Sequence, residues 1–254
     1  MIKLGGSTLG SGDTAIQDVV DLQKSGYFPV IVHGGGKIIN QWIQRTNAEP
    51  KFLNGLRVTD SDTLEVVTAV LTGLVNKQLV GSIAALGGRV FGMSGVDARL
   101  LNARVMDDNL GLVGEITSVD SEFVVRFASD GWMPVIAPIA LALDAAGSPT
   151  GGMLNINGDS AAAALAIALR ADQLIFMTDV PGVLDESKGL IRELTSKQAQ
   201  NLIDRGIAEG GMLPKIRAAI EAANHVKSTH IVDGREPGAL LNCVNGIEIG
   251  TKLG

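Results

Sequence analysis

The sequence predicts an α/β protein built around a mostly parallel sheet. Stretches with strand character alternate with stretches of helical spacing from one end of the chain to the other. The strand candidates are apolar throughout, as in residues 28–32, which is typical of strands buried on both faces of a parallel sheet. Glycine clusters follow several of these strands, at the positions where ligands bind in such sheets.

The first third of the chain supplies each kind of element in turn. Residues 1–4 form a short apolar strand that ends at a Gly/Ser turn, and residues 28–32 form a strand closed by His33 and three glycines. Apolar residues that recur at intervals of three and four predict helices at 14–25, 37–46 and 60–86, the last as one helix or two.

Beyond residue 86 the alternation continues to the C-terminus. Residues 88–95 form a strand that runs into glycine. Apolar and polar residues alternate over 100–105 and 112–120, which predicts a β-hairpin around the polar turn 107–109. Further helices are expected at 123–132, 160–170, 195–204 and 214–225. Further strands are expected at 133–140, 173–179, 228–234 and 246–253.

Length and composition limit the classes of function. A chain of 254 residues with 46% hydrophobic residues can bury a large core, as one domain or two lobes. The net charge of −6 argues against general nucleic-acid binding. The single cysteine, Cys243, excludes an internal disulfide framework and favours a reducing cytoplasm. We find no signal peptide and no apolar run of about 18 residues, so we expect neither export nor a membrane span.

Several common catalytic motifs do not match. The three histidines are isolated in sequence and Cys243 has no cysteine partner, so no zinc pattern is present. The stretch "GMSG" is one residue short of the GxSxG nucleophile elbow. The stretch "HGGGKI" matches neither the P-loop nor the dinucleotide fingerprint.

Two glycine clusters next to strands are candidate anion sites. Lys3 precedes Gly5 and Gly6, and a buried ammonium needs a negative partner, so the strand either delivers Lys3 to an anion or is a ragged terminus. Gly34–Gly36 lie between a strand and a helix, where backbone N–H groups and the helix dipole bind anions. The alternative for this second cluster is a tight turn with unusual dihedral angles.

Polar residues in four other loops each have a functional and a structural interpretation. Arg57 either binds a carboxylate through its guanidinium fork or lies on the surface. Asp159 or Ser160 could be the N-cap of the helix that follows. Asp179 precedes a Pro-Gly turn that would suit nucleotide contacts or be an ordinary turn. Lys215 lies in the first turn of a helix, where the dipole disfavours a cation, and indicates either an anionic partner or an exposed side chain.

Seven motifs, taken in order, carry a specific resemblance: "IKLGGS", "VIVHGGGK", "NGLRVTD", "GMSGVDARLL", "GGMLNINGDSAA", "MTDVPGVL" and "GGMLPKI". Together they resemble the amino acid kinase family, and within it the kinases of N-acetylglutamate, over the whole chain. The resemblance implies a three-layer αβα sandwich around a mainly parallel sheet of about eight strands. It also implies a single domain, 1–254, in which lobe 1–170 binds the acetylated amino acid and dimerises and lobe 171–254 binds ATP.

The resemblance also implies roles for residues of this chain. Lys3 and Lys215 would stabilise the transferred phosphoryl group, with Asp159 between them to hold both in place. Gly5 and Gly6 would face the same group. The acetylated amino acid would be bound by Gly35, Gly36, Arg57 and Asn155. The nucleotide site would be lined by Asp179, Val180, Pro181, Gly182, Val183, Leu184, Gly211 and Met212.

The implied reaction moves the γ-phosphoryl group of ATP to the side-chain carboxylate of N-acetyl-L-glutamate, which gives an acyl phosphate for arginine biosynthesis. A carboxylate is already a nucleophile at pH 7, so no general base is required. The difficulty is to bring two anions together, which calls for positioning and charge neutralisation by lysines, glycine N–H groups and Mg²⁺. We therefore expect ATP and Mg²⁺ as cofactors, and no metal ion held by protein side chains.

Alternatives to this reaction remain open at the level of sequence. An N-acetylaminoadipate kinase of lysine biosynthesis acts on a substrate one methylene longer, which a pocket discriminates by only about 1–3 kcal/mol. Carbamate and isopentenyl phosphate kinases share the fold, but Arg57 with Asn155 favours an amino acid carboxylate. An alternative of another class is a catalytically inactive regulator that binds the metabolite.

Assembly and regulation are also expectations from the resemblance. Arginine-inhibited members of the family carry an extra N-terminal helix that builds hexamers, whereas the sequence here begins at its first strand. We therefore expect a cytoplasmic homodimer without arginine feedback. A PII-type regulator binds some members, and nothing in this sequence indicates one.

Overall fold

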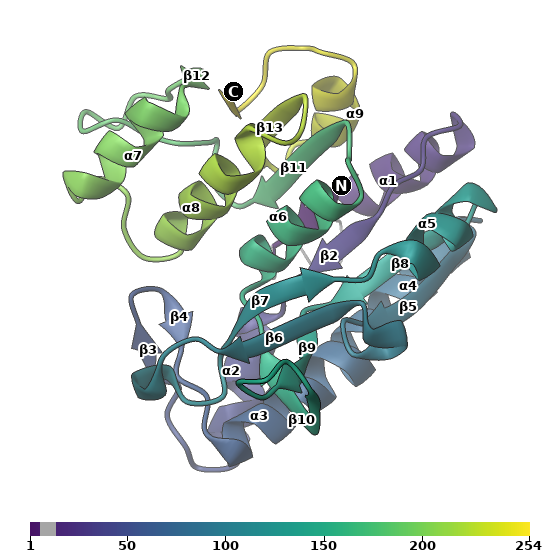
Figure 1. Ribbon diagram of the computed structural model, residues 1–254. Helices are drawn as coiled ribbons and strands as arrows, with labels where there is room; N and C mark the ends of the chain where they lie inside the picture. The colour runs from purple at the N-terminus through teal and green to yellow at the C-terminus, as the bar shows by residue number, and fades with distance from the viewer. Residues whose placement is uncertain (6–13) are drawn as a thin grey trace.

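The central feature of the fold is a mainly parallel sheet (Figure 1). The computed structural model describes residues 1–5 and 14–254. Within these residues the sheet has eight strands in the order β12-β14-β13-β11-β1-β2-β8-β5, all parallel to their neighbours except β13 and β14. The strands are β1 (Ile2–Leu4), β2 (Ile31–His33), β5 (Val90–Ser94), β8 (Met133–Ala137), β11 (Gln173–Thr178), β12 (Glu193–Leu194), β13 (Ser228–Asp233) and β14 (Thr251–Leu253).

Helices cover both faces of this sheet, so the predicted three-layer αβα sandwich is confirmed. One face carries α5 (Glu122–Ser129), α6 (Gly158–Ala168), α7 (Ser196–Asp204) and α8 (Met212–Ala223). The other face carries α1 (Thr14–Lys24), α2 (Gly36–Arg45), the long helix Ser61–Ala85 and α9 (Ala239–Val244).

The two halves of the hydrophobic core alternate along each strand. Phe176 belongs to the cluster on one face of the sheet, while its neighbours Ile175 and Met177 belong to the cluster on the other. Val32 and Ile31 divide in the same way on β2. Because successive side chains of a strand point to opposite faces, strands that are apolar throughout supply both cores at once.

A second, smaller sheet lies beside the first, in the order β10-β9-β6-β7. Its antiparallel pair β6 (Leu101–Val105) and β7 (Gly114–Val119) confirms the predicted hairpin. The single strand expected at 133–140 is wrong: it divides at Pro138 into β8 and β9 (Ile139–Leu143), and the two parts join different sheets. Proline has no N–H to donate to a ladder, which makes it a natural point of division.

Two other strand pairs were not expected from the sequence. The strand β10 (Pro149–Asn155) has the sequence PTGGMLN, whose proline and glycines have low strand propensity. The short hairpin of β3 (Phe52–Leu53) and β4 (Leu56–Arg57) turns at Asn54-Gly55, both with positive φ. An Asn-Gly pair is the strongest local signal for such a turn, so this hairpin could have been found.

The segment expected as one or two helices over 60–86 is continuous but changes its winding. It consists of α3 (Ser61–Thr68), a π-helical stretch Ala69–Val75 and α4 (Asn76–Ala85). Its buried side chains recur every four residues at Val67, Leu71, Val75, Leu79 and Ile83. That spacing drifts by about 40° per step around an α-helix. The wider π turn takes up an extra residue and keeps these side chains on one face.

The same helix bears on the expectation that no segment spans a membrane. Its 25 residues include a stretch of mean hydropathy 1.4, which by length and composition alone could cross a membrane. The sequence shows no continuous apolar run there because threonine, asparagine and lysine interrupt it. Its buried side chains pack in the core beneath the sheet, as in the core helix of a globular domain.

The proposed division into lobes at residue 170 stays a prediction. Strand β1, from the first expected lobe, pairs with β11 of the second as well as with β2. The two parts therefore share one continuous sheet, and the N-terminal strand lies near its centre.

A turn glycine before β14 gives a test of how this sheet edge is built. Gly250 has φ +61°, and a Cβ there would lie 2.2 Å from the carbonyl oxygen of Ile231 on β13. Gly246 also has positive φ, but its Cβ would meet open space. We expect Gly246→Ala to lower the free energy of unfolding by about 1 kcal/mol through backbone strain, and Gly250→Ala to lower it by clearly more because β13 must also move. Urea denaturation measures both, and equal losses would contradict the predicted contact.

Candidate active site

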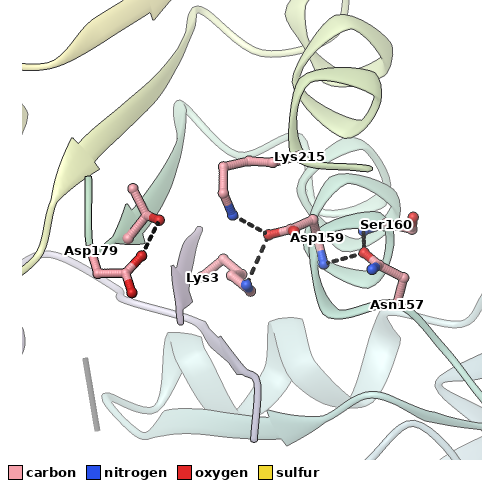
Figure 2. A network of polar contacts seen from close by, with 7 residues as sticks. Lys3, Asn157, Asp159, Ser160, Asp179 and Lys215 are labelled. Carbon is pink, nitrogen blue, oxygen red and sulfur yellow. Dashed lines mark hydrogen bonds and ion pairs between the residues drawn. The ribbon is translucent and has the colours of Figure 1, made fainter. Parts of the chain in front are cut away.

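Three charged side chains from distant parts of the chain meet beside β1. Lys3 comes from that strand, Asp159 from the first turn of α6 and Lys215 from the first turn of α8 (Figure 2). The Nζ atoms of Lys3 and Lys215 lie 2.9 and 3.0 Å from the same oxygen, Oδ1 of Asp159. All three residues are buried, with 8%, 5% and 5% of their surface exposed for Lys3, Asp159 and Lys215. The lysine at residue 3 is therefore not part of a ragged terminus, and Lys215 is not an exposed side chain.

The N-cap of α6 is Asn157, which settles an alternative left open by the sequence. Its side-chain oxygen accepts hydrogen bonds from the backbone N–H groups of Asp159 at 2.9 Å and Ser160 at 3.2 Å. The interpretation of Asp159 or Ser160 as the cap is therefore wrong. Asparagine is as good an N-cap as aspartate. Because Asn157 performs this role, the carboxylate of Asp159 is free to face the lysines.

The charges of this cluster are coupled. Burial alone would raise the pKa of Asp159, but the charges of Lys3 and Lys215 outweigh it and hold that pKa below its ordinary value. Burial and the neighbouring charge of Lys3 lower the pKa of Lys215. Two ammonium groups and one carboxylate leave one positive charge in a place shielded from water, where it attracts an anion more strongly than at the surface.

The two glycine clusters lie next to these lysines. The N–H of Gly34 donates to the carbonyl oxygen of Leu4 at 2.9 Å, and the N–H of Gly5 donates to that of Met177 at 3.1 Å. Gly35 is the N-cap residue of α2, and Gly36 begins the helix. Gly6 lies outside the described residues. Gly34 therefore lies against the carboxyl end of β1, and Gly5 lies against the carboxyl end of β11.

Arg57 is buried without a carboxylate partner in the described part of the chain. It is 8% exposed, so its interpretation as a surface arginine is wrong. One guanidinium nitrogen, Nη2, donates to the side-chain oxygen of Asn40 at 2.6 Å, and the guanidinium lies 4.8 Å from the centre of the Phe52 ring. The other nitrogen, Nη1, is buried and has no hydrogen-bond partner among the described residues. Burial lowers the pKa of Arg57 to about 10. An unpaired buried donor of this kind is suited to an anionic ligand.

Asn155 is brought to Arg57 by a residue that the sequence reasoning missed. The hydroxyl of Thr59, which is fully buried, donates to the carbonyl oxygen of Arg57 at 2.9 Å and accepts from the side-chain amide of Asn155 at 3.1 Å. Asn40 was missed as well. Thr59 lies within the motif NGLRVTD but was assigned no role of its own. Asn40 carried no signal, because its contact with Arg57 forms only in the folded chain.

The residues expected at the nucleotide site fall into two groups. Val180, Gly182, Val183, Leu184 and Met212 line one small hollow of about 230 Å³. Asp179, Pro181 and Gly211 do not line it; Asp179 is exposed at the end of β11, and Gly211 precedes α8. The hollow is completed by residues that the sequence reasoning missed: Leu202, Ile207, Ala208 and Glu209.

Thr251 holds the floor of this hollow in place. Its hydroxyl accepts from the backbone N–H of Val183 at 2.8 Å and donates to the carbonyl oxygen of Ile191 at 2.6 Å. A Cβ on Gly182 would lie 2.6 Å from the same hydroxyl, so only glycine fits there. A mostly apolar hollow of this kind suits a flat heteroaromatic ring.

The described residues contain no group of three or more His, Cys, Asp or Glu side chains placed to hold a metal ion. The carboxylate of Asp159 has both lysines on one of its oxygens.

Comparisons with known proteins agree with this geometry. A model of the amino acid kinase family matches residues 1–233. The chain belongs to the amino acid kinase family. It is 38% identical over 253 residues to acetylglutamate kinase of Dehalococcoides mccartyi, which covers 100% of this chain and 93% of that protein. It is 42% identical over 262 residues to acetylglutamate kinase of a Synechococcus species, with 100% and 83% covered.

Solved structures show the same fold. The structure of smu.665 from Streptococcus mutans UA159 superposes with a TM-score of 0.83 at 32% identity, over 99% of this chain and 96% of that one. Carbamate kinase from Giardia lamblia superposes with a TM-score of 0.71 at 14% identity, over 99% and 96% of the two chains, and shows the fold alone.

The Asp159 cluster gives a prediction for stability. Asp159→Asn leaves two buried ammonium groups facing each other, and we expect it to lower the free energy of unfolding by about 3–5 kcal/mol at pH 7. The matched control is Asp172→Asn, which breaks an exposed ion pair with Lys227 and should cost about 1 kcal/mol or less. Urea denaturation measures both.

The pH dependence of the same comparison follows from the pKa. The pKa of Asp159 in the folded chain lies below 3.8, so its stabilisation is present above pH 3.8 and is lost as the pH falls through the folded-state pKa. The difference in the free energy of unfolding between wild type and Asp159→Asn should therefore shrink as the pH falls below 3.8. A free-energy difference that stays constant down to pH 2 would contradict the pairing of an ionised Asp159 with the two lysines.

Proposed function

We propose that this protein transfers the γ-phosphoryl group of ATP to the side-chain carboxylate of N-acetyl-L-glutamate, a reaction of arginine biosynthesis. One observation carries the proposal: a buried Lys3–Asp159–Lys215 cluster with one excess positive charge lies beside Gly5 and the glycine loop 34–36. Relatives named acetylglutamate kinase match the chain over its whole length, which supports this choice of acceptor.

The described residues offer a set of partners for the acetylated amino acid. The guanidinium of Arg57 offers its unpaired nitrogen to the α-carboxylate, and the amide of Asn155 contacts the acetylamino group. The N–H groups of Gly35 and Gly36 face the acceptor end of the molecule. These contacts hold the side-chain carboxylate in one position, which converts a collision of two anions into a step within one complex.

The transfer itself needs no proton acceptor. An oxygen of the substrate carboxylate attacks the γ-phosphorus, and the bond from that phosphorus to the oxygen bridging the β- and γ-phosphates breaks, so that ADP leaves with the electron pair. Lys3 and Lys215 neutralise the charge on the phosphoryl oxygens during the transfer. Gly5 and Gly6 let the backbone approach the same group closely because neither has a side chain, while the N–H of Gly5 itself stays bonded to Met177. Asp159 keeps both ammonium groups charged and oriented but does not touch the reacting atoms.

The nucleotide binds with its adenine in the hollow lined by Val183, Leu184 and Met212, and Asp179 lies toward its ribose and phosphates. Mg²⁺ arrives bound to ATP as part of the substrate, and supplies further charge neutralisation on the phosphates.

Assembly and location complete the proposal. We propose a homodimer, the state expected from the family resemblance, which light scattering would measure. We place the reaction in the cytoplasm, where ATP is abundant and a lone buried thiol such as Cys243 stays reduced.

A hydroxamate assay tests the function directly. Acyl phosphates react with hydroxylamine, so N-acetylglutamate and N-acetylaminoadipate can be compared side by side with ATP and Mg²⁺. We expect turnover with N-acetylglutamate and much less with the longer substrate. Preference for N-acetylaminoadipate would favour a kinase of lysine biosynthesis. Binding of both ligands without any hydroxamate would favour a catalytically inactive regulator.

Removal of a phosphoryl-stabilising lysine should act on the chemical step. We expect Lys3→Ala to lower kcat by about 10²–10³-fold, by analogy with the loss of one preorganised oxyanion donor. Lys227→Ala, at a lysine whose side chain is 81% exposed, is the control and should leave kcat unchanged. A Lys3→Ala enzyme with near-normal kcat would show that Lys3 does not serve the transfer.

Loss of the buried arginine should act mainly on one substrate. We expect Arg57→Ala to raise KM for N-acetylglutamate by about tenfold or more and to leave KM for ATP nearly unchanged. The reason is that, of the two substrates, Arg57 contacts only N-acetylglutamate. Steady-state kinetics with each substrate varied in turn measures the two values. Equal effects on both substrates would refute the assignment.

A further inference from the structure

A buried histidine directly precedes the glycine loop, and the proposed mechanism leaves it without a role. His33 is the last residue of β2, is fully buried, and is followed by Gly34, Gly35 and Gly36. Its Nδ1 lies 3.0 Å from the carbonyl oxygen of Gly34, and its Nε2 lies 3.2 Å from the side-chain nitrogen of Asn76. Asn76 is also fully buried and begins α4, directly after the π-helical stretch.

The surroundings of Asn76 fix the orientation of its amide. The side-chain oxygen accepts from the ammonium of Lys77 at 3.0 Å. The side-chain nitrogen faces the carbonyl oxygens of Val135 at 2.9 Å and Met93 at 3.3 Å. Both neighbours of the nitrogen are acceptors and the neighbour of the oxygen is a donor, so the amide cannot be turned over without losing all of these contacts.

The fixed amide determines the tautomer of His33. The Nδ1 of His33 faces the carbonyl oxygen of Gly34, which can only accept, and the Nε2 faces the amide nitrogen of Asn76, which can only donate, so the proton of the neutral imidazole lies on Nδ1. The two hydrogens of that amide nitrogen are shared between Nε2 and the two carbonyl oxygens. The Nδ1–H of His33 then donates to the carbonyl oxygen of Gly34. Burial lowers the pKa of His33 to about 4, so the ring is neutral at physiological pH. A neutral ring with both nitrogens engaged is not placed to transfer protons.

The hydrogen bond to Gly34 fixes a peptide plane of the substrate loop. The N–H of Gly34 donates to Leu4, and its carbonyl oxygen accepts from His33, so the residue is held at both ends. In a trans peptide the N–H of the next residue points opposite to the carbonyl oxygen. The direction of the Gly35 N–H therefore follows from the position of the imidazole.

The π-helical stretch supports the same loop by packing. A Cβ on Gly35 would lie 2.8 Å from the Leu71 side chain and 3.4 Å from that of Val75, so the loop backbone rests directly on this stretch. Asn76 follows immediately and reaches His33. The π-helical stretch thus contacts the loop at Gly35 through Leu71 and Val75. The next residue, Asn76, contacts the histidine that precedes the loop.

We propose that His33 is a positioning residue, a neutral imidazole with its proton on Nδ1 that is held by Asn76 and fixes the Gly34–Gly35 peptide so that the loop N–H groups are oriented for the acetylated amino acid before it binds. This inference rests on the proposed function for the identity of the ligand. The orientation of the loop itself does not depend on that function.

Nitrogen NMR tests the tautomer without any substrate. With ¹⁵N-labelled histidine, the His33 ring should show a protonated Nδ1 and an unprotonated Nε2, unchanged down to about pH 5. Asn76→Leu removes the donor to Nε2 and should alter these ring signals and the amide signals of Gly35 and Gly36. A ring with its proton on Nε2, or one that titrates near pH 6.5, would overturn the proposal even if the protein is an active kinase.

Kinetics tests whether the orientation serves the substrate. His33→Ala removes the donor to Gly34, whereas His33→Asn keeps an N–H donor near the position of Nδ1. We expect His33→Ala to raise KM for N-acetylglutamate by about tenfold with KM for ATP nearly unchanged, and His33→Asn to restore most of the loss. Equal rises in both KM values, or no rise in a folded His33→Ala enzyme, would overturn the proposal.

Two further variants separate positioning from general destabilisation. Gly92 lies on β5 and does not touch the loop, but a Cβ there would lie 2.0 Å from the side-chain oxygen of Asn76 and would displace that amide. Gly92→Ala should therefore give the same KM split as His33→Ala, that is, a higher KM for N-acetylglutamate with KM for ATP nearly unchanged. Ile83→Ala creates a cavity in the same helix far from the loop and should lower thermal stability without a KM split. A split in Ile83→Ala, or none in Gly92→Ala, would count against the proposal. If wild type phosphorylates neither acetylated acid, the proposed function fails, while the NMR result still decides the role of His33 in the loop.

Discussion

The carboxylate of Asp159 is the group on which the rest of the site depends. Two buried ammonium groups at hydrogen-bonding distance from one oxygen would otherwise repel each other, and each would carry the full cost of its lost hydration. By pairing with both, Asp159 ties the first strand of the chain to the N-terminal turns of α6 and α8. The cluster keeps a net charge of about +1, because one carboxylate pairs with two ammonium groups. That remaining positive charge is what an incoming phosphoryl group can neutralise.

The parallel sheet explains why these groups arrive at one place. Strand β1 lies between β11 and β2 and is parallel to both, so the carboxyl ends of these three strands lie at the same edge of the sheet. The lysine of β1, the glycine loop after β2 and the turn after β11 are therefore neighbours, although the chain between them is long. The glycine loop is also supported from the opposite face, where the π-helical stretch of the long helix contacts Gly35. A change of winding in a helix far from the reacting atoms is thereby linked to the geometry of the substrate loop.

Much of the fold could be predicted from periodicity, because burial on both faces of a sheet leaves continuous apolar strands and burial of one helix face leaves spacings of three and four. The predictions failed where local pattern and tertiary role disagree. Strand β10 contains proline and glycine and is held by its partner β9, not by its own propensity. The stretch 133–140 is apolar throughout, so nothing in its pattern marks the division that Pro138 makes between two sheets. The candidate site shows a similar limit: charged residues and glycine clusters were found, whereas the neutral polar residues Asn40 and Thr59, which act through hydrogen bonds to Arg57, were not.

The sequence by itself determined the fold class, the order of the motifs and the set of charged and glycine residues that chemistry on two anions would need, because these depend on composition and local spacing. Only the tertiary structure decided which interpretation of each residue holds. It made Asn157 the cap of α6 and so left Asp159 to the lysines, buried Arg57 with an unpaired nitrogen, and gave the ring of His33 a single tautomer. These outcomes depend on burial and on the pairing of donors and acceptors between residues far apart in the chain. No local pattern contains that information, since the partners meet only when the sheet has formed.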